Sequence, residues 1–470
     1  MELWPKVAPT GLWLLSALLL SVVLSLVHSP LVPLPGVVTM LLVPGAVVMS
    51  LLKTRPANTA GRLVLAVCLS MMVIMVVGGV ASLLGPHLAL AHPLNPLPES
   101  VIWIVLAVVA LVLCAVKDRD PVTWIMEGVR TTNFYSVLGA ALLVVLSVLG
   151  AAQLNHTGNN HLAAFATTID VIVLVAGVVG GWKRSNRWPL STLLYFVSLA
   201  LLLSTSLRGA HLYGWDIQKE FGIASRTLHA GAWVIPANHD PFASMLSLTV
   251  LPAVLHSLVK LRLLAFFQLV VPAILALLPL AMFATVRSVP RWVSNGRRVP
   301  PRPGLAFGVV AGIIVSSVAF SSLLVTITRQ AMAVTMLTAI VMVVFDRKMS
   351  ARHAQIAVGL LVASISFTHY TTSYLVAGTL LIAWGVGWLW SRGRLGTRRV
   401  RIEEHRYNVR SRSVLNSTLV IVAFVAALGW NLGVTRNNAL SNTASAFSSQ
   451  GAGLSTSISQ GATISAPELQ

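Results

Sequence analysis

The sequence predicts an all-α polytopic membrane protein with about 13 transmembrane helices. Of its 470 residues, 56% are hydrophobic and only 10% are charged, and the mean hydropathy is +0.82. A soluble domain of this length cannot bury so much apolar surface. The apolar residues form repeated runs of about 17–25 residues, which suits helices that cross a bilayer rather than the alternating strands of a β-barrel. Most of the 33 lysines and arginines lie in alternate loops, as the positive-inside rule requires.

The distribution of charge sets the orientation and excludes one class of partner. A formal net charge of +20 could indicate nucleic-acid binding. Because the positive charge is concentrated in alternate loops, it indicates membrane orientation instead, and we expect no nucleic-acid partner. The N-terminus is predicted to be cytoplasmic and the C-terminus extracytoplasmic. The two cysteines, Cys68 and Cys114, fall inside apolar runs and are predicted to pack as inert side chains.

Six spans form a predicted N-terminal membrane region, residues 1–187. The first follows a short segment with Lys6 and lacks a small-x-small cleavage site, which favours a span over a signal peptide. Basic loops and outer turns alternate between the spans. The six predicted spans are Gly11–His28, Pro35–Leu52, Leu63–Leu84, Val101–Val116, Ser136–Ala152 and Leu162–Trp182.

Seven further spans form a second predicted region, residues 188–434. Residues 242–263 are only moderately apolar, and a span there would break the alternation of basic loops. We therefore expect a short interfacial or re-entrant helix on the outer side. Residues 435–470 are rich in Ser, Ala and Gly, which predicts a flexible extracytoplasmic tail or linker. The seven predicted spans are Trp188–Leu207, Leu264–Thr285, Leu305–Thr326, Arg329–Phe345, Ile356–Tyr370, Ser373–Trp390 and Leu415–Val434.

The polar stretch between Arg208 and Pro241 carries a large share of the acidic residues. The whole chain has only 13 of them, and Asp216, Glu220 and Asp240 all lie in this one outer loop. If the segment is helical, Asp216 and Glu220 are four residues apart and share one face. Two carboxylates on one face can hold a divalent cation, or divide the roles of base and orienting group. Solvated loop acids paired with neighbouring bases are an equally good interpretation.

A second polar cluster lies at the far end of the same loop. His239 and Asp240 precede Pro241, and such a pair can bind a metal or a sugar hydroxyl. Asp before Pro is also a common helix start, and capping is the favoured interpretation for Asp240. The predicted substrate-binding residues are Arg208, His239 and Asp240. The predicted ligands of a divalent cation, Mg²⁺ or Mn²⁺, are Asp216, Glu220 and His239.

Basic and aromatic residues at the outer ends of later spans form a third group. A cation at the mouth of a span, such as Arg329, costs energy unless it meets an anion, and a lipid phosphate would suit it. Snorkelling to headgroups explains Arg329 equally well. His369 can donate a hydrogen bond to a phosphate or a leaving group, whereas Tyr370 has the position of an interfacial belt residue. The predicted lipid-phosphate-binding residues are Arg329, His369, Lys260, Arg262 and Tyr370.

One carboxylate, Asp170, lies deep inside the sixth predicted span. It could relay protons, but a hydrogen bond with Thr167 or Thr168 is the favoured interpretation. The chain has no Walker-type loop, GxSxG elbow, HExxH or CxxC motif. Nucleotide hydrolysis and soluble-type hydrolase chemistry therefore have no support in the sequence.

Three short stretches carry a resemblance to known membrane proteins. RGAHLYGWDIQKEF (208–221), RQAMAVTML (329–337) and FTHYTTSYL (367–375) are similar to a family of large prokaryotic membrane proteins, domain of unknown function 2206 (DUF2206). An outer acidic loop directly after a span, followed by a basic interfacial helix and more spans, resembles the GT-C glycosyltransferases. The resemblance covers about Arg208 to Trp430 and implies a location in the cytoplasmic (plasma) membrane of a prokaryote.

The GT-C resemblance implies an activity and a set of roles. Such enzymes transfer a sugar from a polyprenyl-phosphate donor to a glycan, lipid or protein acceptor at the outer membrane face. An acid in their first large outer loop acts as base or metal ligand. Carried over, Asp216 is that acid and Glu220 its helper, while Arg329 and His369 face the lipid phosphate. Residues 188–434 then form a GT-C-like seven-span module, with residues 208–262 as its catalytic loop.

Two departures and two alternatives accompany this resemblance. The two adjacent acids typical of the family are absent, because Ile217 follows Asp216, and six spans precede the loop. A polysaccharide polymerase or ligase, or a lipid-linked-sugar flippase, also combines many spans with a large outer loop. Asp170 alone lies deep, which argues against a flippase, and the Asp216–Glu220 pair favours a transferase. A non-catalytic membrane scaffold is predicted to leave its acids scattered towards bulk water.

Overall fold

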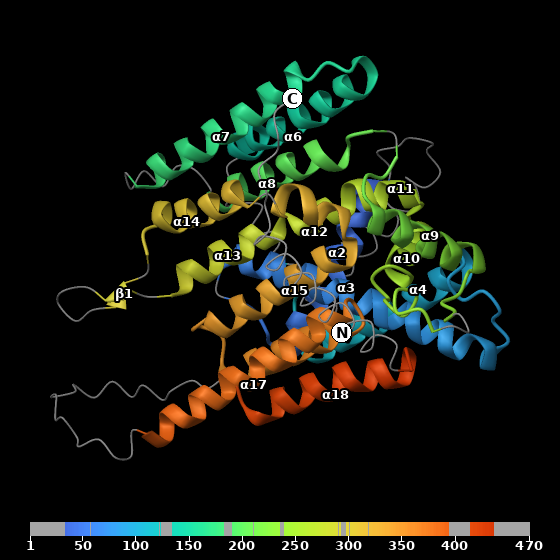
Figure 1. Cartoon of the computed structure of the whole chain (residues 1–470). Coiled ribbons are helices and arrows are strands. Elements are labelled where there is room, and N and C mark those ends of the chain that lie inside the picture. Colours follow the sequence, from blue (N-terminus) through green and yellow to red (C-terminus); the bar gives the residue numbers. More distant parts are fainter. Residues whose placement is uncertain are drawn as a thin grey trace, which may run out of the picture.

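The described part of the computed structural model is helical apart from one short pair of strands (Figure 1). It comprises residues 33–436 except 57, 122, 124–133, 183–189, 210, 236–238, 290, 293–297, 300, 318 and 394–413. Within it, nine helices are long and apolar enough to cross a membrane. A tenth crossing results if Pro303–Val315 and Phe320–Thr326, bent by 66°, form one broken span. The predicted all-helical membrane class is therefore confirmed.

One short pair of strands interrupts the succession of helices. Strand β1 pairs antiparallel with β2, with Arg291 opposite Val299. In chain order the elements are α2 (Pro33–Leu52), α3 (Thr59–Leu84), η1 (Gly85–Leu88), α4 (Pro96–Val116), α6 (Phe134–Thr157), α7 (His161–Trp182), α8 (Leu190–Ser206), α9 (Trp215–Ala230), α10 (Val250–Val259), α11 (Leu263–Ala265), η2 (Phe266–Val270), α12 (Val271–Leu275), α13 (Leu277–Ser288), β1 (Arg291–Trp292), β2 (Arg298–Val299), α14 (Pro303–Ser316), η3 (Ala319–Leu323), η4 (Leu324–Thr326), α15 (Thr328–Phe345), α16 (Ala351–Ser366), α17 (Tyr370–Gly393) and α18 (Ser417–Val434).

Each predicted span after the first coincides with a helical segment of this list. The first, Gly11–His28, lies outside the described residues, as does nearly all of the predicted tail. Two of the others are short, since α8 has 17 residues and α16 has 16. A straight crossing of the hydrocarbon core needs roughly 20. The total of about 13 spans and the GT-C likeness of the bundle stay predictions.

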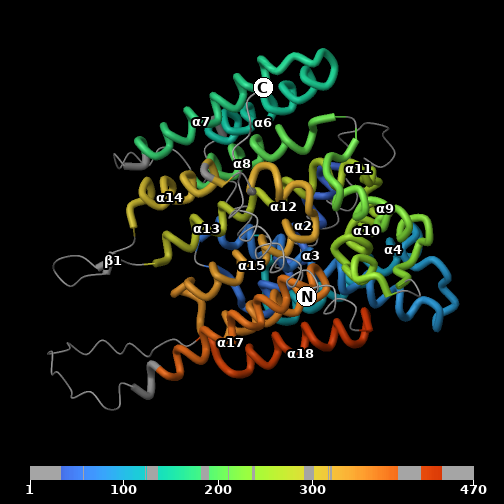
Figure 2. The backbone as a smooth tube through the Cα atoms, in the orientation of Figure 1, coloured from blue at the N-terminus to red at the C-terminus, as the bar shows by residue number. Residues whose placement is uncertain are grey.

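Helix α3 occupies the centre of the bundle (Figure 2). It packs against α2, α10, α13, α15 and α16. Helix α2 approaches it closely at Gly45, where an added Cβ would lie 1.9 Å from the carbonyl oxygen of Ala66. The Gly45 amide donates a hydrogen bond to Ser70 Oγ at 2.7 Å. Both cysteines, including Cys68 in α3, are free and buried, as predicted.

Helix α3 also connects two polar ends of the molecule. Its 26 residues span about 39 Å at a rise of 1.5 Å per residue. It begins beside the basic turn that contains Arg55, and Asn58 caps its first turn. Beyond its last turn, the Leu94 amide donates to the carbonyl of Gly231, directly after α9, at 2.8 Å. We call these two regions the basic end and the α9 end; α9 and α10 lie on the right of Figure 1.

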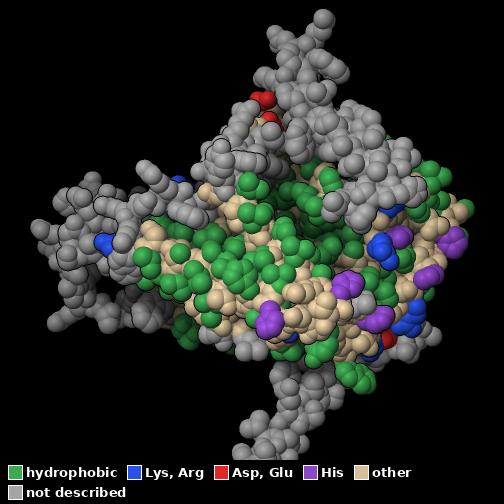
Figure 3. Space-filling view, turned by 90° about the horizontal axis from the view of Figure 1, so that it is seen from above, with side chains coloured by type: hydrophobic (Ala, Val, Ile, Leu, Met, Phe, Trp, Pro, Cys, Tyr) green, Lys and Arg blue, Asp and Glu red, His purple; other side chains and the backbone are tan. Residues whose placement is uncertain are grey.

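The surface between the two ends is apolar. Large hydrophobic side chains are exposed along α4, α6, α7, α17 and α18. Figure 3 shows hydrophobic side chains across the middle of one face, with histidines, lysines and arginines gathered towards its right-hand side. Exposed apolar surface of this extent suits contact with lipid rather than water. The structure thus agrees with a bilayer environment.

Helix α10 is too short to cross a membrane. Its ten residues extend about 15 Å, half of the hydrocarbon core. Before it, Ser247 Oγ donates to the Thr368 carbonyl at 3.1 Å, and near its end Ser257 Oγ donates to the Leu94 carbonyl. Both partners belong to the α9 end. Since most of its residues are buried by protein, α10 has the character of a re-entrant helix rather than one spread on a lipid surface.

Candidate functional site

Helix α9 presents one buried face to the bundle, and Glu220 lies on it. The buried positions recur every three or four residues, as a helix packed on one side requires. Gly214 precedes the helix at φ 120° and Gly231 follows it at φ 61°, both left-handed conformations that favour glycine. The buried residues of α9 are Ile217, Glu220, Ile223, Ala224 and Thr227.

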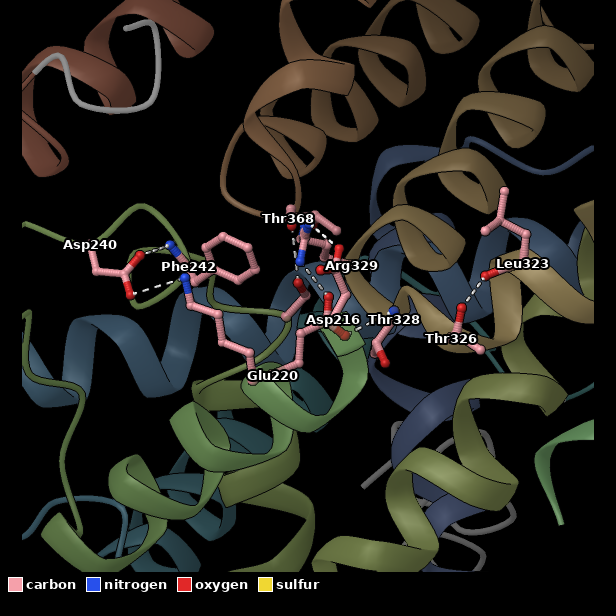
Figure 4. A network of polar contacts seen from close by, with 11 residues as sticks. Asp216, Glu220, Asp240, Phe242, Leu323, Thr326, Thr328, Arg329 and Thr368 are labelled. Carbon is pink, nitrogen blue, oxygen red and sulfur yellow. Dashed lines mark hydrogen bonds and ion pairs between the residues drawn. The ribbon is translucent and has the colours of Figure 1, made fainter. Parts of the chain in front are cut away.

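A forked ion pair joins α9 to the start of α15 (Figure 4). Arg329 Nη1 donates to Glu220 Oε1 at 2.7 Å, and Arg329 Nη2 donates to Asp216 Oδ2 at 2.8 Å. The backbone amide of Thr328 donates to the other oxygen of Glu220, Oε2, at 2.9 Å. Charge-assisted hydrogen bonds of this length are the strong ones in proteins. The two acids predicted to share a helix face therefore meet a cation that lies 109 and 113 residues further along the chain.

The three side chains differ sharply in exposure. The Glu220 side chain is completely buried and that of Arg329 is 10% exposed, whereas the Asp216 side chain is 42% exposed. Burial raises the pKa of Glu220 to about 7, against the opposing effects of the Arg329 charge and the Thr328 hydrogen bond. The cluster therefore holds a buried carboxyl group that exchanges its proton near neutral pH, and a carboxylate that solvent can reach.

A second layer of contacts surrounds Arg329. Its guanidinium carbon lies 4.1 Å from the centre of the Phe242 ring, and Lys219 Nζ lies 3.8 Å from the same ring centre. Lys219 Nζ also lies 3.8 Å from Asp240 Oδ2. The Phe242 amide donates to Asp240 Oδ1 at 3.0 Å, so this carboxylate caps the turn that begins at its own residue. Asp240 thus joins the cluster through Lys219 and Phe242.

His369 lies in the turn between α16 and α17 and is buried. Its Nδ1 accepts a hydrogen bond from the Thr372 amide at 3.1 Å and lies 2.8 Å from the Thr372 hydroxyl. Burial, and then the charge of Arg329, lower the pKa of His369 to about 3. The ring is therefore neutral, and an accepting Nδ1 leaves the proton on Nε2. Tyr370, the first residue of α17, stacks on this ring at a centroid distance of 5.5 Å.

Other predicted site residues have contacts elsewhere. Arg208 Nε donates to the Ser204 carbonyl at 3.1 Å in an exposed position at the end of α8. His239 Nδ1 lies 3.2 Å from the carbonyl of Val434, the last residue of α18. Lys260 and Arg262 are exposed in the short segment between α10 and α11.

The residues predicted to bind a divalent cation do not form a ligand set. In the described part of the chain, no group of three or more His, Cys, Asp and Glu side chains could hold a metal ion. Asp216 and Glu220 bind Arg329 instead, and His239 contacts the end of α18. A guanidinium thus takes the place between the two carboxylates that the prediction gave to a metal.

The deep carboxylate does not make the predicted hydrogen bond. Asp170 is buried in α7. Thr167 and Thr168 instead donate to the carbonyls of Ala163 and Ala164, one turn earlier in the same helix. Thr and Ser hydroxyl groups in apolar helices commonly donate their hydrogen bond to a backbone carbonyl of the same helix.

Four participants were absent from the predicted site: Lys219, Thr328, Phe242 and Thr372. For Thr328 the sequence held a signal, because a span predicted to begin at Arg329 has unpaired amides in its first turn, and such amides attract carboxylates. Phe242 and Thr372 contribute through contacts that no spacing rule indicates.

Comparisons with protein-family models, with curated proteins and with solved structures find no match for this chain. The resemblance to the GT-C and DUF2206 families stays a prediction.

Proposed function

We propose that this protein transfers a sugar from a polyprenyl-phosphate-linked donor to an acceptor at the predicted outer face of the membrane, with Asp216 as the base. The observation that carries the proposal is the half-exposed Asp216 carboxylate, fixed by Arg329 at the edge of a buried ionic network. A carboxylate with one oxygen held in a hydrogen bond and the other oxygen free is well placed to act as a general base.

The proposed reaction requires a base, a cation for the departing phosphate, and side chains that hold the base in position. Asp216 Oδ2 is bonded to Arg329, and Oδ1 has no hydrogen bond within the described part of the chain. In the proposed reaction Oδ1 accepts the proton of the acceptor hydroxyl. The acceptor oxygen then forms a bond to the anomeric carbon of the sugar, and the bond from that carbon to the phosphate oxygen breaks. Polyprenyl phosphate leaves with the electron pair of the broken bond.

Lys219 is a better partner for the lipid phosphate than Arg329. Both terminal nitrogens of Arg329 bind carboxylates, and its side chain is only 10% exposed. The Lys219 side chain is 51% exposed and follows Asp216 by three residues on α9. We therefore assign Arg329 and Glu220 to positioning Asp216, and Lys219 to the departing phosphate.

Two exposed aromatic residues shortly precede the proposed base in the chain. Trp215 is 94% exposed and Tyr213 is 75% exposed. Rings at this location can stack on a sugar ring or anchor the loop at the membrane interface. The clustered acids also argue against the scaffold alternative, for which they were expected to point separately towards bulk water.

The test compares Asp216→Asn with the wild-type protein in liposomes. The donors are a panel of polyprenyl-phosphate hexoses, and the measurement is the release of polyprenyl phosphate in the presence of an extract of cell-envelope glycolipids. We expect release by the wild type and a loss of at least about 100-fold in the variant, since a positioned base contributes roughly 10²–10⁴-fold.

Glu403→Gln, in a predicted cytoplasmic loop, is the matched control and should retain full activity. Equal activity of Asp216→Asn and the wild type would remove Asp216 as the base. Failure of the wild type to release polyprenyl phosphate from any donor of the panel would refute the proposed reaction.

A further inference from the structure

A cavity of about 590 Å³ lies at the basic end, where α2 and α4 end and α3 begins. It is separated from the site on α9 by the length of α3, about 39 Å for 26 residues. Its volume falls within the range of about 300–1,000 Å³ typical of small-molecule sites. The cavity is therefore independent of the proposed transferase site and large enough for a ligand.

Cross-links between loops hold the walls of the cavity in place. Arg55 donates to Ser50 Oγ at 3.2 Å and also to the backbone carbonyl of Asp120, which joins the α2–α3 turn to the segment after α4. The Asp120 carboxylate accepts from the amide of Thr123 at 3.0 Å and from its hydroxyl. This carboxylate is thus engaged in capping the turn that follows it.

Cations dominate the lining. Its charged lining residues are four cations, Lys53, Arg55, Arg62 and Arg119, and two acids, Asp118 and Asp120. Arg119 Nε is buried, and no acceptor reaches it within the described part of the chain. A buried N–H group without an acceptor is rare and costly in proteins. An anion with several acceptor oxygens would satisfy it.

Two helix ends bring residues to the same cavity. Lys53 has φ 56° and Asp118 has φ 49°, both in the left-handed region that residues with a Cβ seldom adopt. They follow the ends of two different helices, α2 and α4, and both line the cavity. Each helix ends in a Schellman turn, in which the amides of Thr54 and Arg119 donate to the carbonyls of Met49 and Cys114. These turns bring Lys53 and Asp118 to the cavity wall.

We propose that this cavity binds a phosphate group, with Arg62 and Arg119 as its main ligands. Arg62 Nε donates to the Pro56 carbonyl at 3.0 Å, which fixes its guanidinium beside the cavity. Guanidinium groups bind phosphate oxygens through paired hydrogen bonds, and Lys53 adds a point charge at the mouth. The phosphate belongs either to a lipid headgroup of the adjacent leaflet or to a soluble phosphate compound.

The experiment has one arm for each source and uses the purified full-length protein. In the first arm, the protein in phosphatidylcholine nanodiscs is titrated with radiolabelled pyrophosphate by equilibrium dialysis. In the second, phosphatidylglycerol replaces part of the phosphatidylcholine, and native mass spectrometry counts the phosphatidylglycerol molecules retained by the protein. We expect saturable binding in at least one arm, and the arm that shows it identifies the source.

The double variant Arg62→Gln/Arg119→Gln should weaken this binding by about tenfold or more, because each arginine makes charge-assisted hydrogen bonds. The matched control is Arg347→Gln/Lys348→Gln, which removes the same charge from an exposed turn after α15. That turn lies near the start of α3, since an added Cβ at Gly61 would lie 3.2 Å from Met342 Sδ. The control should bind as the wild type does.

Absence of saturable binding in both arms, or an equal loss in the double variant and the control, would overturn the proposal. Folding of the double variant is checked by its elution volume and its circular dichroism. If the double variant fails to fold, the same binding measurements are made on Lys53→Gln, which changes an exposed residue. That variant should bind several-fold more weakly, and unchanged binding would count against the site.

Discussion

The substitution Glu220→Gln tests the electrostatics of the buried network. Burial raises the pKa of Glu220 from its ordinary value of 4.5 to about 7 in the folded protein. The folded state therefore holds the proton more tightly than the unfolded state does. The stabilisation from this proton is fully present below pH 4.5, and it is lost as the pH rises through the folded-state value of about 7.

The size of the effect follows from the same two values. The interval between 4.5 and about 7, at about 1.4 kcal/mol per pH unit, corresponds to about 3 kcal/mol of unfolding free energy. Glutamine has no proton to exchange, so Glu220→Gln lacks this dependence. The stability of the wild type relative to the variant should fall by about 3 kcal/mol between pH 4.5 and 7 and stay level above that.

The measurement is the unfolding free energy in mixed micelles at a series of pH values. His369, whose pKa is lowered to about 3, adds the opposite trend, because stability rises with pH between about 3 and 6.5. Both proteins contain His369, so its contribution cancels in the difference. Glu403→Gln serves as the control and should follow the wild type. A difference between wild type and Glu220→Gln that does not vary from pH 4.5 to 7 would refute the reasoning.

Three further outcomes test other parts of the structure. Arg329→Gln leaves a buried carboxyl group without its cation and should cost about 3–5 kcal/mol of unfolding free energy, whereas Arg347→Gln on the surface should change it by less than about 0.5; similar effects of the two would contradict the buried ion pair. Gly45→Ala drives a methyl group into the backbone of α3 and should cost about 1–3 kcal/mol or more, while Gly429→Ala in α18, with nothing within 4 Å, should be neutral; equal unfolding temperatures would count against the close approach. His369 should show no titration between pH 5 and 8 in histidine-selective nuclear magnetic resonance; a midpoint near 6.5 would show that the ring is accessible to water.

The helices were predictable because one physical rule sets their length. Within the described residues, each predicted span from Pro35 onwards falls mainly on helical segments. The class of the protein follows from those runs alone. The number of crossings does not, because α8 and α16 are shorter than a straight span and α14 is bent at its junction with η3.

The candidate site was predictable in part. The alternation of basic loops predicted Asp216 and Arg329 on one side of the membrane, and the spacing of Asp216 and Glu220 predicted one helix face. Their direct contact required the three-dimensional packing of α9 against the start of α15. The same packing explains why Arg329 binds the two acids. From composition and spacing alone, a lipid phosphate was an equally good partner for Arg329.

The short buried helix α10 has a consequence for how the chain is assembled during synthesis. A ten-residue segment is too short to be released sideways into lipid as a span. It packs against α2, α3 and α4, which precede it in the chain, and Ser247 just before it donates to the carbonyl of Thr368, which follows it. Helix α10 can therefore reach its buried position only by packing between parts of the protein that are synthesised before and after it.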